Sequence, residues 1–147
     1  MDISIGSDHA GFEQKQALIP YLESLGYKVI DRGPQDDNRV DYPDFAEKVG
    51  HDVASGRAQF GVLVCGTGIG MAIAANKVSG IRAANVVSPD FASLARQHNN
   101  ANIVAVSGRF VSLDTNKAII KTFLETEFEG GRHANRVAKI MALEKNE

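Results

Sequence analysis

The fold is decided by the stretch Val62-Leu63-Val64-Cys65-Gly66-Thr67-Gly68-Ile69-Gly70. The apolar run before the glycines predicts a strand over Phe60–Val64 that is buried on both faces, and the pattern after them predicts a helix over Met71–Lys77. The glycines let a ligand approach the backbone closely. Because the first N–H groups of a helix lack internal partners, an anion or a thiolate is stabilised there. The stretch therefore predicts an active-site loop over residues 65–70, with Cys65 as nucleophile or base.

Strand-like and helix-like segments alternate on both sides of this loop. Parallel strands need crossover connections, so the alternation predicts an α/β fold. We expect one domain over residues 1–147, a Rossmann-like α/β/α sandwich around a doubly wound, five-stranded parallel sheet. The expected strands are Asp2–Gly6, Tyr27–Asp31, Phe60–Val64, Arg82–Val87 and Ile103–Val106. The expected helices are Gly11–Leu25, Asp41–Ser55, Met71–Lys77, Asp90–Gln97, Asp114–Thr126 and Arg132–Glu144.

Ligands bind at the carboxyl ends of the strands in such a sheet. Two further loops follow predicted strands, Ser7-Asp8-His9 and Ser107-Gly108-Arg109. Asp8 and His9 suit an acid–base or ligand-binding pair. A helix cap by Asp8 with an incidental His9 explains the same residues about as well.

The composition excludes several classes of function. A net charge of −2 gives no electrostatic basis for general nucleic-acid binding, and the apolar runs are far shorter than a membrane span requires. The residues Met1–Ser4 lack the features of a signal peptide. A lone cysteine fits a reducing compartment, and four scattered histidines show no zinc-ligand spacing. We therefore expect a cytoplasmic protein without a bound metal.

The candidate residues also have structural explanations. A free cysteine is often only a small buried hydrophobe, and a glycine turn often only packs a helix on a strand. The order G-T-G-I-G differs from the G-x-G-x-x-G of dinucleotide sites and follows the third strand rather than the first. A small phosphorylated or enolisable ligand suits so short a loop better than a dinucleotide does.

Two clusters near the C-terminus are similarly ambiguous. His98-Asn99-Asn100 closes a predicted helix, where histidine and asparagine are favoured for structural reasons alone. Arg132 and Arg136 lie one helical turn apart, which makes either a phosphate clamp or a solvated basic face. His51 and His133 are locally unremarkable.

Taken together, these residues resemble the type B ribose-5-phosphate isomerases, within the wider family that includes galactose-6-phosphate isomerase subunits. The resemblance runs from residue 6 to residue 136. The matching motifs are Gly6-Ser7-Asp8-His9-Ala10-Gly11-Phe12, Asp41-Tyr42-Pro43, Cys65-Gly66-Thr67-Gly68-Ile69-Gly70, Ala74-Ala75-Asn76-Lys77, Gly80-Ile81-Arg82-Ala83, Arg96-Gln97-His98-Asn99 and Gly130-Gly131-Arg132-His133.

The resemblance implies an aldose–ketose isomerisation of a sugar phosphate that needs no metal or other cofactor. Cys65 would be the base that moves a proton between C1 and C2 through an enediolate, with help from the hydroxyl of Thr67. The amides of residues 66–70 would hold the developing oxyanion. His98 would open the furanose ring, and Asp8 would bind the sugar or help to open it. Further substrate contacts are implied for His9, Arg109, Arg132 and Arg136 at the phosphate and for Asn99 and Tyr42 at the sugar.

Family members are homodimers, often paired into tetramers, whose sites are built from two subunits. The resemblance therefore implies that Cys65 and the pair Arg132 and Arg136 come to one site from different chains. A six-carbon substrate such as allose or galactose 6-phosphate is the closest alternative. A non-catalytic sugar-phosphate-binding protein is a second alternative. A redox sensor is a third, but the chain has no resolving cysteine.

Overall fold

The sheet of the computed structural model, which describes residues 1–144, has five parallel strands. They run in the order β2-β1-β3-β5-β4, so the last two strands are exchanged relative to their order in the chain. The strands are β1 (Asp2–Ser7), β2 (Lys28–Asp31), β3 (Phe60–Cys65), β4 (Ala83–Asn85) and β5 (Ile103–Ser107). The predicted five-stranded parallel sheet is confirmed. The last three residues of the predicted domain, 145–147, lie outside the described part.

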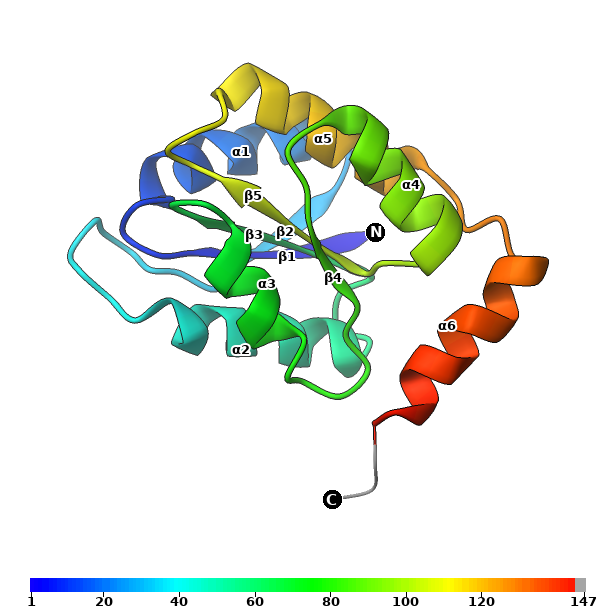
Figure 1. The fold of residues 1–147 in the computed structure, drawn as a ribbon. Coiled ribbons are helices and arrows are strands. Elements are labelled where there is room, and N and C mark those ends of the chain that lie inside the picture. The colour runs from blue at the N-terminus through cyan, green and yellow to red at the C-terminus, as the bar shows by residue number, and fades with distance from the viewer. Residues whose placement is uncertain (145–147) are drawn as a thin grey trace.

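Helices cover both faces of the sheet, as Figure 1 shows. One face carries α1, α4 and α5, and the other carries α2 and α3 (Figure 1). Successive side chains of β3 point to opposite faces of the sheet. Val62 and Val64 belong to the core under α1, α4 and α5, whereas Leu63 and Cys65 belong to the core under α2 and α3. The helices are α1 (Phe12–Ser24), α2 (Tyr42–Ala54), α3 (Ile69–Ala75), α4 (Pro89–Asn99), α5 (Leu113–Glu125) and α6 (Arg132–Ala142).

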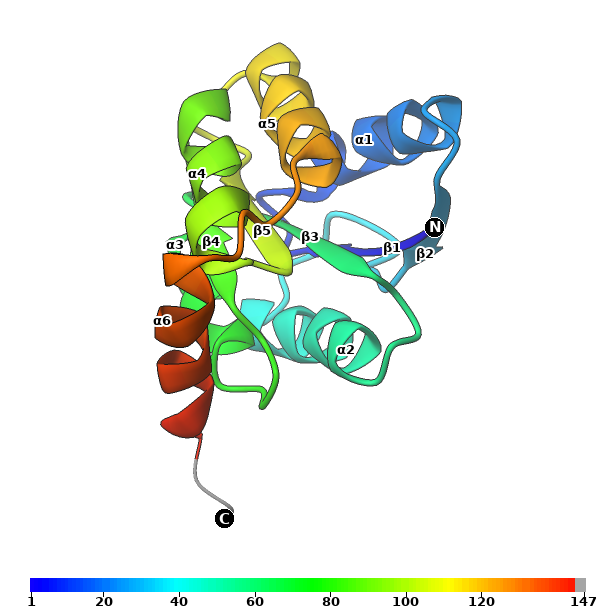
Figure 2. The same ribbon diagram turned by 90° about the vertical axis from the view of Figure 1, so that its right-hand side faces the viewer.

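The last helix stands beside the sandwich rather than on it. Figures 1 and 2 show α6 next to the β4 edge of the sheet, where it extends past the body of the domain. Among the described side chains of this helix, His133 and Val137 are buried, whereas Ile140 is 43% exposed. A helix with so narrow a buried face leaves most of its surface free for solvent or for another chain.

Most predicted elements differ from the structure by one or two residues at an end, and the differences at β4 and α3 bear on the site. The strand expected over Arg82–Val87 is regular only over Ala83–Asn85, because it is an edge strand that pairs with β5 alone. The helix expected from Met71 begins earlier, at Ile69, and ends at Ala75. Gly68 takes a left-handed conformation at its N-cap, and this turn brings the first helical residues close behind Cys65.

Candidate active site

Cys65 is the last residue of β3, and its thiol is held by the loop that follows. Its Sγ accepts a hydrogen bond from the backbone N–H of Gly68 at 3.1 Å. Gly68 reaches this position with φ of +85°. This conformation costs a residue with a side chain about 1–2 kcal/mol. The Gly68 N–H is aimed at the sulfur, where a hydrogen bond to a charged acceptor is stronger than one to a neutral acceptor. The geometry therefore supports the predicted nucleophile or base.

The hydroxyl of Thr67 belongs to the same turn. Its Oγ1 accepts the N–H of Ile69 at 3.1 Å, and the side chain faces solvent at the mouth of the loop. Two loop amides are thus engaged by protein groups, those of Gly68 and Ile69. The Thr67 hydroxyl keeps its own proton free to donate to a ligand.

The end of β5 anchors the loop from the other side. The N–H of Gly108 donates to the carbonyl of Cys65 at 2.8 Å, and the Ser107 hydroxyl donates to the carbonyl of Gly66 at 2.7 Å. The N–H of Arg109 donates to the same Gly66 carbonyl at 3.2 Å. The guanidinium of Arg109 lies against Gly66, since a Cβ at that glycine would sit 3.5 Å from Nη1. Arg109 thus puts a positive charge beside the loop.

The loop after β1 completes the same edge of the sheet. The N–H of Asp8 donates to the carbonyl of Val64 at 3.2 Å, which places this buried carboxylate next to the thiol loop. Asp8 Oδ1 accepts the N–H of Gly11 at 2.9 Å, but the N-cap of α1 is Gly11 itself, so Asp8 holds the turn before the helix and is not its cap. His9 Nδ1 accepts the N–H of Val40 at 3.3 Å. This contact leaves the other ring nitrogen of His9 as the proton donor when the imidazole is neutral.

Tyr42 forms a wall of this site. It is the first residue of α2, and its ring packs on the backbone of Gly70, where a Cβ would come within 2.7 Å of the ring. The side chain remains 40% exposed. The structure therefore brings together Asp8, His9, Tyr42, Arg109 and the loop 65–70.

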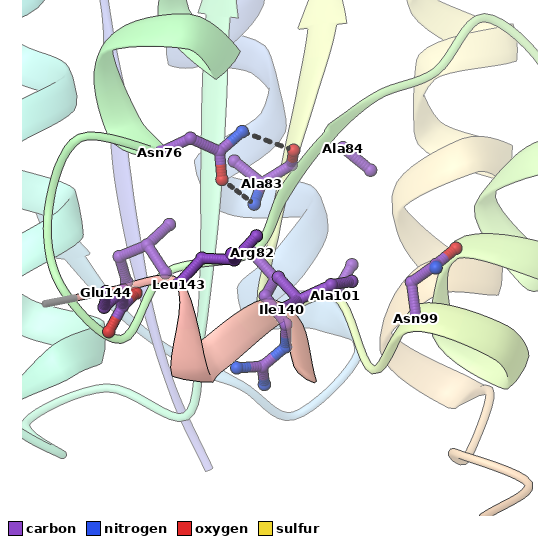
Figure 3. Close-up of a pocket in the computed structure, with 10 residues that line it drawn as sticks. Asn76, Arg82, Ala83, Ala84, Asn99, Ala101, Ile140, Leu143 and Glu144 are labelled. Carbon is purple, nitrogen blue, oxygen red and sulfur yellow. Dashed lines mark hydrogen bonds between the residues drawn. The ribbon is translucent and has the colours of Figure 1, made fainter. Parts of the chain in front are cut away.

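The other predicted site residues lie at the opposite end of the strands, where the strands begin. Cys65 pairs with Ser107 at the carboxyl end of β5, whereas His98 and Asn99 end α4 just before the amino end of that strand. A strand of this length separates the two edges by about 13 Å. Asn99 lines a pocket between β4 and α6 (Figure 3). Arg132 and Arg136 are exposed on α6. One chain alone does not bring these four residues to Cys65.

Sequence reasoning missed His133. Its ring stacks on that of His98 with centroids 4.3 Å apart, and its Nε2 lies 3.4 Å from a carboxylate oxygen of Glu129. Burial lowers the pKa of His133, and the nearby His98 and Arg132 lower it further, whereas Glu129 opposes the shift. Asn100, two residues after His98, is the C-cap of α4 and takes a left-handed conformation. The sequence offered no signal for this contact, because Glu129 precedes α6 and the four-residue spacing rule holds only within a helix.

The same three side chains are potential metal ligands. The ligating atoms of His98, Glu129 and His133 lie within 4.8 Å of one another. However, the two imidazole planes differ by only 16°, so their in-plane lone pairs run side by side instead of converging on one point. This arrangement suits a stacked histidine pair better than a metal centre.

The family model for ribose/galactose isomerases matches residues 3–140. The chain belongs to the ribose/galactose isomerase family. It is 44% identical to ribose-5-phosphate isomerase B of Escherichia coli strain K12 over 142 residues, which cover 97% of this chain and 95% of that protein.

Solved structures of the family superpose closely on this fold. Ribose-5-phosphate isomerase B of Clostridium thermocellum gives a TM-score of 0.96 at 49% identity, with 97% of each chain covered. The Mycoplasma genitalium enzyme with bound ribulose-5-phosphate gives a TM-score of 0.95 at 45% identity, and the match covers 99% of this chain and 97% of that one. Within residues 1–144, the helices of this family member are all too short or too polar to cross a membrane.

Proposed function

We propose that the protein is an aldose–ketose isomerase that interconverts ribose 5-phosphate and ribulose 5-phosphate, with Cys65 as the base. The observation that carries the proposal is the 3.1 Å hydrogen bond from the Gly68 N–H to Cys65 Sγ, at the carboxyl edge of the sheet in a member of this family. Relatives named for this activity match nearly the whole chain, and one of them holds ribulose-5-phosphate in its structure.

The chemistry is a proton transfer between neighbouring carbons. The thiolate of Cys65 takes the proton from C2 of the open-chain aldose, and the electron pair left behind forms the C1–C2 double bond of an enediolate. The Thr67 hydroxyl and the loop amides other than those of Gly68 and Ile69 bear the negative charge that develops on oxygen. The thiol returns its proton to C1, a proton passes from the C2 oxygen to the C1 oxygen, and the ketose results. The residues provide this route without a metal or an organic cofactor.

The phosphate of the substrate needs positive charge and N–H donors at a distance from the base. Arg109 supplies a guanidinium beside Gly66, and His9 supplies a ring N–H whose direction is set by the contact with Val40. Asp8 follows β1 beside the thiol loop, and its second carboxylate oxygen can accept a sugar hydroxyl. Tyr42 bounds the loop on the side of α2, where its ring packs on Gly70.

We propose further that a second copy of this chain completes the site. His98, Asn99, Arg132 and Arg136 lie at the far edge of their own sheet, so they reach a Cys65 loop only from a neighbouring subunit. Several large apolar side chains near the β4 edge are exposed. They lie on α3, on α4 and on the turn before α4, and we name this set of side chains the apolar face. The apolar face consists of Ile69, Ile73, Val87, Phe91 and Leu94, which are 39–60% exposed. Such a surface favours a homodimer, with a homotetramer as a pair of dimers.

The test follows proton exchange at C2 of ribose 5-phosphate in deuterated water without added metal. We expect exchange and ketose formation with the natural protein, and a loss of roughly 10²–10⁴-fold in Cys65→Ala. Ribose 5-phosphate should still protect Cys65→Ala against heat, because the phosphate contacts remain. Exchange that is seen only with allose or galactose 6-phosphate would change the substrate to a six-carbon sugar. Binding without exchange on any of the three sugars would make the protein a non-catalytic sugar-phosphate-binding protein.

A further inference from the structure

Asn85 links the edge strand to the loop that holds the thiol. It is the last residue of β4, and its side-chain Nδ2 donates to the carbonyl of Thr67 at 3.3 Å and to the carbonyl of Ala105 at 3.1 Å. Ala105 lies opposite Asn85 in the ladder between β4 and β5. Both N–H bonds of the amide are therefore used, one on the sheet and one on the loop.

The carbonyl of Thr67 and the N–H of Gly68 belong to one peptide unit. A trans peptide is planar, and its C=O and N–H bonds point in opposite directions. Asn85 therefore holds one end of this unit while Cys65 Sγ accepts the N–H at the other end. Hydrogen bonds in such a chain also polarise one another, which strengthens the donor that faces the sulfur.

This peptide needs an external restraint. Gly68 has φ of +85° and lacks the side chain that would limit its rotation, so the N–H is not kept in place by the loop alone. The Asn85 amide packs directly on it, since a Cβ at Gly68 would lie 2.4 Å from Nδ2 and 3.1 Å from the backbone of Val106. The loop is thus confined between the Asn85 side chain and β5.

We infer that Asn85 is a positioning residue for the base of the reaction. It does not touch the thiol, and it acts by fixing the Thr67–Gly68 peptide so that the Gly68 N–H stays aimed at Cys65 Sγ. This inference rests on the proposed role of Cys65. Its consequence is that loss of the Asn85 amide destabilises the thiolate and slows the proton transfer, while substrate binding is hardly affected.

Asn76, the C-cap of α3, provides a matched control because it bonds to the same strand. Its side chain also makes two hydrogen bonds to main-chain atoms, from Nδ2 to the carbonyl of Ala83 at 2.9 Å and from the N–H of Ala83 to Oδ1 at 2.8 Å, as Figure 3 shows. These bonds hold the opposite end of β4, at the C-cap of α3. Asn76→Ala therefore removes a similar number of bonds from β4 without loosening the peptide that faces Cys65.

The experiment compares Asn85→Ala and Asn85→Asp with Asn76→Ala in the full-length protein. Aspartate keeps the size of asparagine but cannot donate to the Thr67 carbonyl, so it covers the case in which Asn85→Ala fails to fold. We expect kcat for ribose 5-phosphate to fall roughly tenfold in both Asn85 variants, the effect of losing about one hydrogen bond, with KM changed less than about twofold. The rate at which iodoacetamide alkylates Cys65 at neutral pH should fall in these variants and stay unchanged in Asn76→Ala.

Equal alkylation rates in all three variants, or an equal loss of kcat in Asn76→Ala, would overturn the inference. The alkylation measurement does not depend on turnover. If Cys65→Ala kept its exchange activity, the proposed base would be wrong, and the alkylation comparison would still decide whether Asn85 orients the peptide at the thiol. The two failures are therefore distinguishable.

Discussion

At the scale of single residues, Gly68 is constrained both by its left-handed backbone conformation and by the neighbouring Asn85 side chain. Alanine there meets both an unfavourable φ and the Asn85 amide, so we expect Gly68→Ala to turn the Gly68 N–H away from Cys65 and to reduce C2 proton exchange more than roughly tenfold. Gly56 is the control, because its φ is +82° but a Cβ there meets nothing within 4 Å. Gly56→Ala should cost about 1–2 kcal/mol in denaturant unfolding and keep its exchange rate. Equal activities in the two variants would show that the loop tolerates a side chain at Gly68.

At the scale of elements, Asp52 fastens α2 to the sheet. Its carboxylate accepts two bonds from Arg32, both 2.6 Å, and one from the Ser4 hydroxyl at 2.8 Å. Burial alone would raise the pKa of Asp52, but the hydrogen bonds from Arg32 and Ser4 outweigh it and lower the pKa below its ordinary value. The folded state thus favours the ionised carboxylate, and the resulting stability is present above about pH 4 and is lost as the pH falls further. We expect Asp52→Asn to lose on the order of 3 kcal/mol at pH 7 in urea unfolding and to show a flatter acid profile than exposed Asp114→Asn. Parallel acid profiles for the two variants would contradict this account.

At the scale of the whole molecule, the proposed sharing of each site between two subunits predicts complementation. Cys65→Ala and Arg132→Ala should each be nearly inactive alone, because every site then lacks either the base or a phosphate ligand. In a mixed dimer with sites shared across a two-fold axis, one site carries both substitutions and the other carries neither. After subunit exchange of an equal mixture, about one quarter of the natural activity should therefore return. Mixing Cys65→Ala with Gly68→Ala is the control, since both changes affect the same half-site and should restore nothing. An equal mixture that stays inactive after verified exchange would place each complete site within one chain.

The sequence by itself determined the parallel sheet, the loop over residues 65–70 and the family. Strand and helix periodicities depend on neighbouring residues, so an apolar run such as Val62–Val64 predicts its own element without knowledge of the rest of the chain. The carboxyl ends of parallel strands share one edge, which also made the meeting of Asp8, His9, Cys65 and Arg109 predictable from their places after strands.

Only the tertiary structure decided which distant side chains meet. The order β2-β1-β3-β5-β4 puts Asn85 opposite Ala105 and next to Thr67, and no local pattern around residue 85 carries that information. In the same way, the packing of α6 beside α4 stacks His133 on His98 and keeps both away from the Cys65 loop of their own chain. Local preferences act over a few residues, whereas these contacts depend on how the whole chain crosses the sheet, because that path alone sets which residues become neighbours.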